Sequence, residues 1–308
     1  MIKIRPETVQ DYSAIAAVNV LAFKNRAAEA GIVALHRQRT NFDPALSLVA
    51  EVDSKIAGHV LFTPQKVRIA GEFIEAVCLA PIAVHPAYQK QGIGKKLIEA
   101  GHAIAREKSY AFSFLLGHPT YYPLLGYKVK AFGSSSLTVQ ISERKESVAE
   151  FKTRSLIEDD IQYLNAMWDS SEKDVDFSLE PGKELLEWLS PHPLIESTIY
   201  ADEEGIAGFT RINTLKKDSP TFFLARNNET AHRLTRYIAA TAEFSRITLP
   251  IHPSSTLAKG LGEIKLETWE AAMLFPLAQG IVEEYYAQVQ TGERLPGSPV
   301  WSTAFDLD

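Results

Sequence analysis

The feature that most constrains the fold of this chain is a segment in which a strand pattern leads into a glycine loop and then into a helix pattern. Residues 75–84 are mostly apolar and predict a strand, which Pro86 ends. The loop that follows contains Gly92 and Gly94, and apolar residues recur at helical spacing from Leu97 onward. Glycine lets backbone N–H groups turn inward with no Cβ in the way, and the first helical turn adds unpaired N–H groups with partial positive charge. The segment therefore predicts a site for a phosphate or pyrophosphate.

Two familiar phosphate-binding loops do not match this segment. A Walker A loop requires glycine five residues before the Gly-Lys pair and Ser or Thr after it, and these positions hold Gln89 and Lys96. A dinucleotide-binding fingerprint requires a third glycine where this chain has Leu97. For the two glycines taken alone, a plain strand–loop–helix connection is the alternative.

The first 140 residues alternate between strand and helix patterns. Thr8 stands in an N-cap position before Ile15, Val18 and Ala22, which predict a helix. Predicted strands lie at residues 2–5, 46–51, 56–62, 75–84 and 111–116. This order of elements predicts an α/β fold.

The second half of the chain repeats this plan. Three echoes occur in the same order in both halves: residues 5–11 and 154–160, residues 56–58 and 206–208, and residues 118–119 and 252–253. Their offsets are 149, 150 and 134 residues. We place the boundary in the charged stretch near residues 142–151 and predict two domains, residues 1–145 and 151–308, which agrees with the length of the chain. Chance similarity between two α/β halves is the alternative.

Composition excludes several classes of protein. With 32 basic and 38 acidic residues, the formal net charge of −6 gives no long-range field that would attract nucleic acid or an anionic membrane. Cys78 is the only cysteine, which excludes an intramolecular disulfide and a cysteine-based zinc cage, and we expect no metal. No apolar run approaches the ~18 residues of a membrane span or forms a secretory signal. We therefore expect a cytoplasmic protein, whose oligomeric state the sequence does not indicate.

Two motifs resemble those of the Gcn5-related N-acetyltransferase (GNAT) superfamily. Gln-x-x-Gly-x-Gly at residues 89–94, preceded by Pro-Ile-Ala-Val-His-Pro at residues 81–86, resembles the acetyl-CoA loop of that family. Residues 116–127 are similar to its late strand and Tyr-x-x-x-Gly-aromatic ending, especially to a bacterial branch with Gly-His-Pro or Gly-Asp-Pro before two tyrosines. The resemblance covers residues 1–140 and implies the GNAT fold, an α/β (α+β) architecture whose central mixed, mostly antiparallel sheet is flanked by helices.

The resemblance also implies how acetyl-CoA binds as the co-substrate. Backbone groups of Ile82, Ala83 and Val84 would pair with the pantetheine arm as another strand does. The loop N–H groups would receive the pyrophosphate, from Gln89, Lys90, Gln91, Gly92, Ile93, Gly94 and Lys95. Lys90 or Lys95 could add positive charge, and a solvated helix start is the alternative for each lysine.

Acetyl transfer from a thioester to an amine needs one group that takes a proton from the amine and another that gives a proton to the leaving sulfur. Tyr122, four residues before Gly126, holds the position of the family's general acid, and packing against pantetheine is the alternative. Glu75, acting through a water molecule, and His118 are the candidates for the base; an exposed carboxylate and a loop contact are their alternatives. Cys78 has no neighbouring base pattern, so we predict a buried thiol in place of a nucleophile.

The second half lacks this loop. Residues 225–233 occupy the corresponding place without a glycine pair, and Glu229 would repel an anion there. We therefore predict a degenerate GNAT-like domain without a cofactor site, and residues 174–187 and 269–286 could roof the acceptor cleft. The four tryptophans are expected in the core.

The implied function is transfer of an acetyl group from acetyl-CoA to a primary amine by direct attack. The acceptor would be a small-molecule or peptide amine. The alternative is a non-catalytic acyl-CoA-binding regulatory or scaffold protein. An open acceptor cleft would favour the enzyme, whereas a cleft filled by the second domain would favour the alternative.

Overall fold

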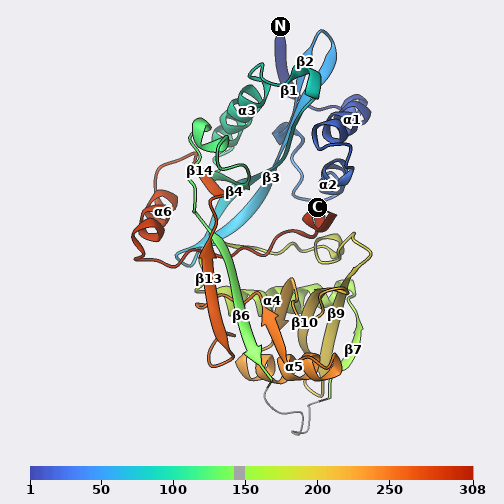
Figure 1. Cartoon of the computed structure of the whole chain (residues 1–308), viewed down its shortest axis with the longest axis vertical. Coiled ribbons are helices and arrows are strands. Elements are labelled where there is room, and N and C mark those ends of the chain that lie inside the picture. The colour runs from blue at the N-terminus through green and yellow to red at the C-terminus, as the bar shows by residue number, and fades with distance from the viewer. Residues whose placement is uncertain (142–149, 308) are drawn as a thin grey trace.

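Three sheets organise the part of the chain that the computed structural model describes, which is residues 1–141 and 150–307. The largest sheet has the strand order β1 (Ile2–Pro6), β2 (Ser47–Val52), β3 (Lys55–Ile69), β4 (Glu72–Val84), β5 (Phe112–Leu116) and β14 (Ala272–Pro276), with β8 (Ser178–Leu179) also paired to β3. The second sheet has the order β11 (Phe222–Ala225), β10 (Gly205–Asn213), β9 (Ile195–Asp202) and β7 (Lys152–Ser155). The third has the order β12 (Arg246–Leu249), β6 (Gly133–Gln140) and β13 (Glu263–Thr268). Figure 1 shows the largest sheet at one end of the molecule and the other two at the opposite end.

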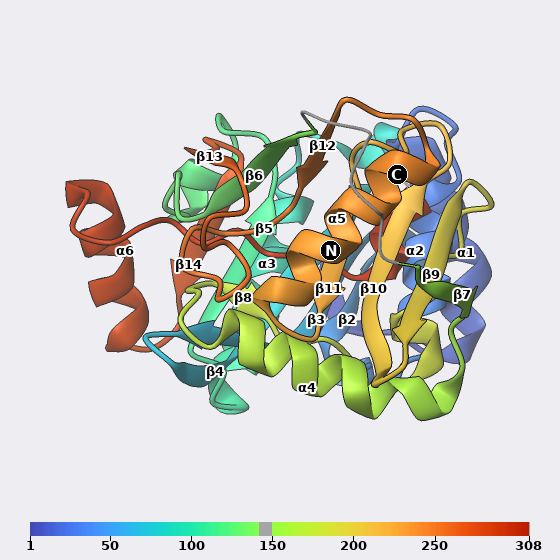
Figure 2. The ribbon, with the colours of Figure 1, turned by 90° about the horizontal axis from the view of Figure 1, so that it is seen from below.

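Helices cover both faces of the two larger sheets. They are α1 (Tyr12–Ala22), α2 (Ala28–His36), α3 (Ile93–Glu107), α4 (Ile161–Glu172), α5 (Asn228–Thr241) and α6 (Ile281–Thr291). On β2, Leu48 and Ala50 pack toward α3, whereas Val49 between them packs toward α1 and α2, as the alternation of a strand requires. Figure 2 shows α4 and α5 against the second sheet. No helix within the described ranges is long and apolar enough to cross a membrane.

The strand pairings are those of a mixed sheet. β4 and β5 are parallel, and the other strand pairs of the described residues are antiparallel. The predicted fold class, a mixed and mostly antiparallel sheet flanked by helices, is therefore confirmed.

The two halves of the sequence exchange strands. β6 belongs to the first half, but it pairs with β12 and β13. β14 belongs to the second half, but it pairs with β5, with Ala272 opposite Leu116. The charged stretch chosen as the boundary lies outside the described residues. The division into residues 1–145 and 151–308 stays a prediction, and strand pairing crosses it in both directions.

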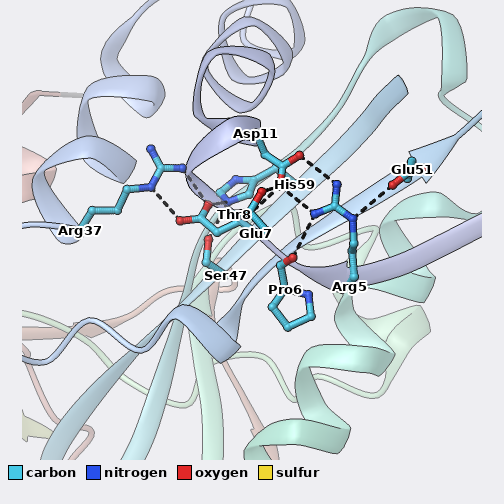
Figure 3. Close-up of polar contacts among 9 residues, drawn as sticks. All are labelled: Arg5, Pro6, Glu7, Thr8, Asp11, Arg37, Ser47, Glu51 and His59. Carbon is cyan, nitrogen blue, oxygen red and sulfur yellow. Dashed lines mark hydrogen bonds and ion pairs between the residues drawn. The ribbon is translucent and has the colours of Figure 1, made fainter. Parts of the chain in front are cut away.

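The first echo in the sequence is a repeated local structure. Arg5 donates hydrogen bonds to both carboxylate oxygens of Asp11, at 2.7 and 2.9 Å, and Arg154 does the same to Asp160, at 2.6 and 2.7 Å. Each carboxylate also accepts the backbone N–H of the residue three positions before it. The backbone of that residue has φ −125° and ψ 165° in both copies. Figure 3 shows the copy in the first half.

The second echo is a repeated bulge in a hairpin. In β2–β3 and β9–β10 the register shifts around Ala57 and Ala207, each of which follows an isoleucine and precedes a glycine. The carbonyl of Ala57 accepts the N–H of His85 at 2.9 Å, and that of Ala207 accepts the N–H of Arg226 at 2.8 Å. In the first half this bond fixes His85, directly after β4, and in the second half it fixes Arg226, directly after β11. Each of these residues begins the loop that leads to the next helix.

Candidate active site

The site begins where β4 and β5 separate. The two strands pair only over residues 76–78 of β4, and beyond them the β5 side of β4 has no strand partner among the described residues. On its other side β4 carries a bulge, because Phe62 lies opposite Leu79 whereas Val60 lies opposite Ile82. A bulge bends a strand and increases its twist. The end of β4 therefore presents an open backbone edge, and it lines a cavity of about 1450 Å³.

The glycine loop forms one end of this cavity. A 3-10 turn (Pro86–Tyr88) follows β4, and α3 begins at Ile93, directly after Gly92. Gly92 has a φ of +77°, a left-handed conformation that residues with a Cβ rarely adopt. The first N–H groups of α3 have no partner within the helix, and this turn lies in the cavity wall. The loop therefore offers N–H donors and the positive end of a helix dipole to the cavity.

Most of the predicted cofactor-binding residues lie in the cavity wall. They are Ile82, Val84, Gln89, Lys90, Gly92, Ile93, Gly94 and Lys95. Ala83, which is 2% exposed, and Gln91, which is exposed, are not part of the wall. The Lys95 side chain is 61% exposed and its Nζ lies 3.8 Å from Oε1 of Glu99, which agrees with a solvated helix start.

Two tyrosines connect the end of β5 with the start of α3. The rings of Tyr121 and Tyr122 are 5.2 Å apart and nearly perpendicular. A Cβ on Gly117 would lie 2.2 Å from the ring of Tyr122, so glycine is needed for this packing. The hydroxyl of Tyr121 lies 2.7 Å from the place of a Cβ on Gly94, in the first turn of α3. Burial, with a smaller contribution from Tyr121, raises the pKa of Tyr122 to about 12, so its phenol is protonated at neutral pH.

The structure separates the two candidate bases. His118 is exposed and lies in the cavity wall close to the tyrosines. Glu75 lies outside it: its carboxylate is 54% exposed and 3.9 Å from Nζ of Lys66, beside a separate pocket of about 290 Å³. Cys78 is the first residue of β4 in the cavity wall, three residues and roughly 10 Å from Glu75 at a rise of 3.3 Å per residue. The assignment of Glu75 as a base is therefore not supported by its position, and His118 is the predicted base that reaches the cavity.

The other end of the cavity is built from residues that the sequence analysis did not assign. They are Phe23 after α1, Glu29 and Ile32 of α2, Arg211 of β10, and Trp269, Trp301, Phe305 and Asp306 from the last forty residues. No local motif marks them, since the fold brings them together from distant segments. Of the two predicted roof segments, residues 269–286 contribute Trp269, whereas residues 174–187 contribute nothing to the cavity wall.

The tryptophans divide between core and cavity. Trp168 and Trp188 are 4% and 1% exposed and lie in the core, as expected. Trp269 lines the cavity and is 37% exposed, so the expectation of a core position is wrong for it. Trp301 also lines the cavity, but it packs against the core, with its ring 6.1 Å from that of Phe114. Their surroundings combine residues of both halves of the chain, which a pattern within one segment does not reveal.

The corresponding loop of the second half is closed by its own side chains. The side chain of Asn227 accepts the N–H of Thr230 at 2.8 Å and caps α5. Arg226 donates to both carboxylate oxygens of Asp202, at 2.9 and 2.7 Å.

In residues 1–141 and 150–307, no group of three or more His, Cys, Asp or Glu side chains is arranged to hold a metal ion.

Comparisons with known proteins agree with the geometry. Residues 3–130 match the family model described as an acetyltransferase (GNAT) domain. The uncharacterized N-acetyltransferase YjhQ of Escherichia coli K12 is 40% identical over 102 residues, which are 32% of this chain and 55% of YjhQ, so the chain matches about half of that relative. The uncharacterized N-acetyltransferase YhbS of the same strain is 34% identical over 129 residues, 42% of this chain and 74% of YhbS.

A solved structure extends the likeness to both halves. A conserved protein of unknown function from Enterococcus faecalis V583, described as a probable N-acyltransferase, aligns with 92% of this chain and 74% of its own. The TM-score is 0.68 at 11% sequence identity. At this identity the likeness concerns the fold alone.

Proposed function

We propose, for a chain that belongs to the GNAT superfamily of acetyltransferases, the transfer of an acetyl group from acetyl-CoA to a primary amine by direct attack. One observation carries the proposal. A single cavity joins the open edge of β4 and the glycine loop to Tyr122, and it continues into a space between the two halves of the chain. A donor and an acceptor can therefore meet at Tyr122 from opposite ends of the cavity.

The donor end suits acetyl-CoA. The amides of a pantetheine arm can pair with the free edge of β4 beyond Cys78, as in strand addition. The pyrophosphate would receive N–H groups from the loop and from the first turn of α3, where the helix dipole favours an anion. Lys90 and Lys95 lie in the wall at this end, where Lys90 would add positive charge, whereas Lys95 is exposed beside Glu99.

The reaction needs two proton movements. An ammonium acceptor first releases one proton to water, or to His118 at the cavity wall, and becomes a neutral amine. Its nitrogen then forms a bond to the thioester carbonyl carbon while the carbon–sulfur bond breaks. Tyr122 donates its phenolic hydrogen toward the sulfur and regains a proton from the nitrogen through solvent. Burial raises the pKa of Tyr122 to about 12, so the phenol is protonated before the reaction begins.

The second half is proposed to be a degenerate copy of the same fold without a cofactor site. The repeated Arg–Asp pair, the repeated bulge and the position of α5 after β11 support this origin. Its role is to complete the acceptor end of the cavity with Arg211, Trp301 and Asp306. The open cavity supports an enzyme over the alternative of a non-catalytic acyl-CoA-binding regulator or scaffold.

The test is acetyl-CoA binding to the full chain by calorimetry. Gly92→Asp and Gly92→Asn both place a side chain at the left-handed position, which Asp and Asn tolerate better than other residues, but only aspartate adds negative charge beside the pyrophosphate. We expect binding of one equivalent to the native chain and an affinity lower by about tenfold or more in Gly92→Asp than in Gly92→Asn. Gly71→Asp is the control, since Gly71 has a φ of +79° in a remote turn. Equal affinities in the two Gly92 variants would contradict the assignment of the loop, and failure to release CoA with any primary amine would contradict the proposed reaction.

A further inference from the structure

Glu29 is a buried carboxylate in the acceptor end of the cavity that no other side chain satisfies. It lies in the first turn of α2, is 6% exposed and forms part of the cavity wall. Its Oε2 has no hydrogen-bond partner among the described residues. A buried carboxylate without a donor is costly. The position therefore suits a cationic group of a ligand as the missing partner.

Among the described charged side chains at the acceptor end, Glu29 is the one without an ion-pair partner. Away from the glycine loop, the other charged side chains in the wall are Arg211 and Asp306. Nε of Arg211 lies 3.8 Å from Oδ2 of Asp306. Arg211 also donates to the carbonyl of Trp301 at 3.1 Å and to Oγ1 of Thr221 at 3.3 Å. Arg211 and Asp306 therefore already have each other as partners, whereas no ion pair is found for Glu29 among the described residues.

Most of the other side chains at this end are apolar or aromatic. Its wall contains Phe23, Ile32, Trp269, Trp301 and Phe305, together with the hydroxyl groups of Ser135, Thr221 and Ser298. The apolar and aromatic side chains favour an apolar or aromatic body and can stack on a cation. The hydroxyl groups of Ser135, Thr221 and Ser298 already form hydrogen bonds within the chain, so they are poorly placed to serve a ligand with many hydroxyl or amino groups.

The helix that carries this carboxylate is held in place by contacts at its C-terminal end and along its buried face. Arg37, directly after α2, donates to both carboxylate oxygens of Glu7 in β1–α1, at 2.8 and 2.7 Å (Figure 3). The buried face of α2 packs on the C-terminal 3-10 helix (Thr303–Leu307), where the rings of His36 and Phe305 are 5.5 Å apart. Glu29 thus projects from an anchored helix rather than from a loop, which suits a binding group.

We propose that the acceptor end selects a monocationic primary amine with an apolar or aromatic body, whose ammonium group binds Glu29. The inference rests on the proposed function and specifies its substrate class. One carboxylate without an ion-pair partner matches one ammonium, and the aromatic side chains of the wall match the body that carries it. Polyamines and aminoglycosides would bring several cationic groups. The other described carboxylate at this end, Asp306, also has an oxygen without a hydrogen-bond partner, but that oxygen lies 3.8 Å from Nε of Arg211, so a cation there would compete with an existing ion pair.

The first experiment measures binding without turnover. Calorimetry on the full chain, saturated with CoA, compares 2-phenylethylammonium with its neutral analogue 2-phenylethanol. We expect the native chain to prefer the ammonium by about tenfold or more, the range for a hydrogen bond to a charged group. Glu29→Gln keeps the shape of the side chain and should lose this preference, whereas Glu29→Asp should keep part of it. The control is Glu283→Gln, which removes a glutamate from the first turn of α6, outside the cavity wall.

The second experiment measures CoA release from acetyl-CoA. We expect kcat/KM for 2-phenylethylamine to exceed that for spermidine and kanamycin by about tenfold or more, and Glu29→Gln to raise KM far more than it lowers kcat. Preference for the polycationic amines, or a Glu29→Gln variant that behaves like Glu283→Gln, would overturn the inference while leaving acetyl transfer in place. Melting curves identify a variant that fails to fold, in which case Glu29→Asp supplies the comparison. Absence of turnover with every amine contradicts the proposed function instead, and the binding preference still decides the role of Glu29.

Discussion

At the scale of single residues, Tyr122 and Cys78 face the same cavity in environments that keep both protonated. Burial raises the pKa of the Cys78 thiol to about 12, and burial together with Tyr121 raises the pKa of Tyr122 to about 12. A thiol in this state is a poor nucleophile, because the thiolate is the reactive form. A phenol in this state remains a hydrogen donor over the whole physiological pH range. The environment therefore favours direct attack by the amine over transfer through an acetylated cysteine.

The first prediction at this scale concerns Tyr122→Phe. The substitution keeps the ring between Tyr121 and Tyr127 and removes the hydroxyl, so acetyl-CoA affinity by calorimetry should persist. The rate of CoA release should fall by roughly 10²–10⁴-fold, the usual contribution of a general acid. Tyr121→Phe is the matched control. Similar losses in both variants, or a near-normal rate in Tyr122→Phe, would return Tyr122 to a packing role.

The site could be predicted from sequence only where a local pattern carries it. The glycine loop depends on the φ of Gly92 and on the start of a helix, and both follow from neighbouring residues. Glu75 was assigned from its place on the correct strand, but position along the strand decides whether a side chain reaches the cavity. Glu29 and Trp301 reach it through the packing of α2 and of the C-terminal segment, which no short pattern records.

At the scale of elements, α2 shows why one helix of the first half could not be predicted from the sequence. Its buried face consists of Glu29, Ile32, Val33 and His36, so half of the positions that would show apolar periodicity are polar. In α3, by contrast, the predicted face is buried from Leu97 to Ala105. The strands were predicted from their apolar runs. The polar pattern of β6, with three consecutive serines, carried no comparable signal.

The prediction at this scale is an acid sensitivity of the α2 packing. Both ring nitrogens of His36 lack hydrogen-bond partners in the described structure. Burial, with a smaller contribution from Arg39, lowers the pKa of His36 from 6.5 to about 3. Below pH 6.5 His36 therefore binds a proton in the unfolded chain but stays neutral in the folded chain. The free energy of unfolding consequently falls as the pH falls toward 3.

Urea unfolding of the native chain and of His36→Leu measures this contribution. Between pH 7 and pH 5, which lies above the range of ordinary carboxylates, the native chain should lose about 2 kcal/mol more than the variant. His102, whose pKa burial lowers to about 4, is present in both proteins and cancels. Parallel pH profiles for the two proteins would show that His36 is not held neutral by the fold.

At the scale of the whole molecule, the order of elements in the first half and two locally repeated structures could be predicted. The partners of the strands could not. A hydrophobic pattern specifies which face of a strand is buried and says nothing about which half supplies its neighbour. The third echo marks the difference: His118 is exposed beside the cavity, whereas His252 is 3% exposed and lies 3.1 Å from the carbonyl of Pro296. The two halves therefore differ in structure at this echo, which lies close in sequence to the strands that they exchange.

The last prediction follows from that exchange. Residues 1–145 expressed alone lack β14, whose Met273 and Leu274 are 0% exposed and pack in the two cores beside β5. Losing such a side chain costs about 2–5 kcal/mol, and the whole stability of a domain is about 5–15 kcal/mol. The fragment should therefore be unfolded or aggregated by gel filtration and circular dichroism. Coexpression with residues 151–308 should restore a complex that binds one equivalent of acetyl-CoA, since β6 and β14 would pair across the break. A monomeric fragment of residues 1–145 that melts as the full chain does would mean that the exchanged strands contribute little to the fold.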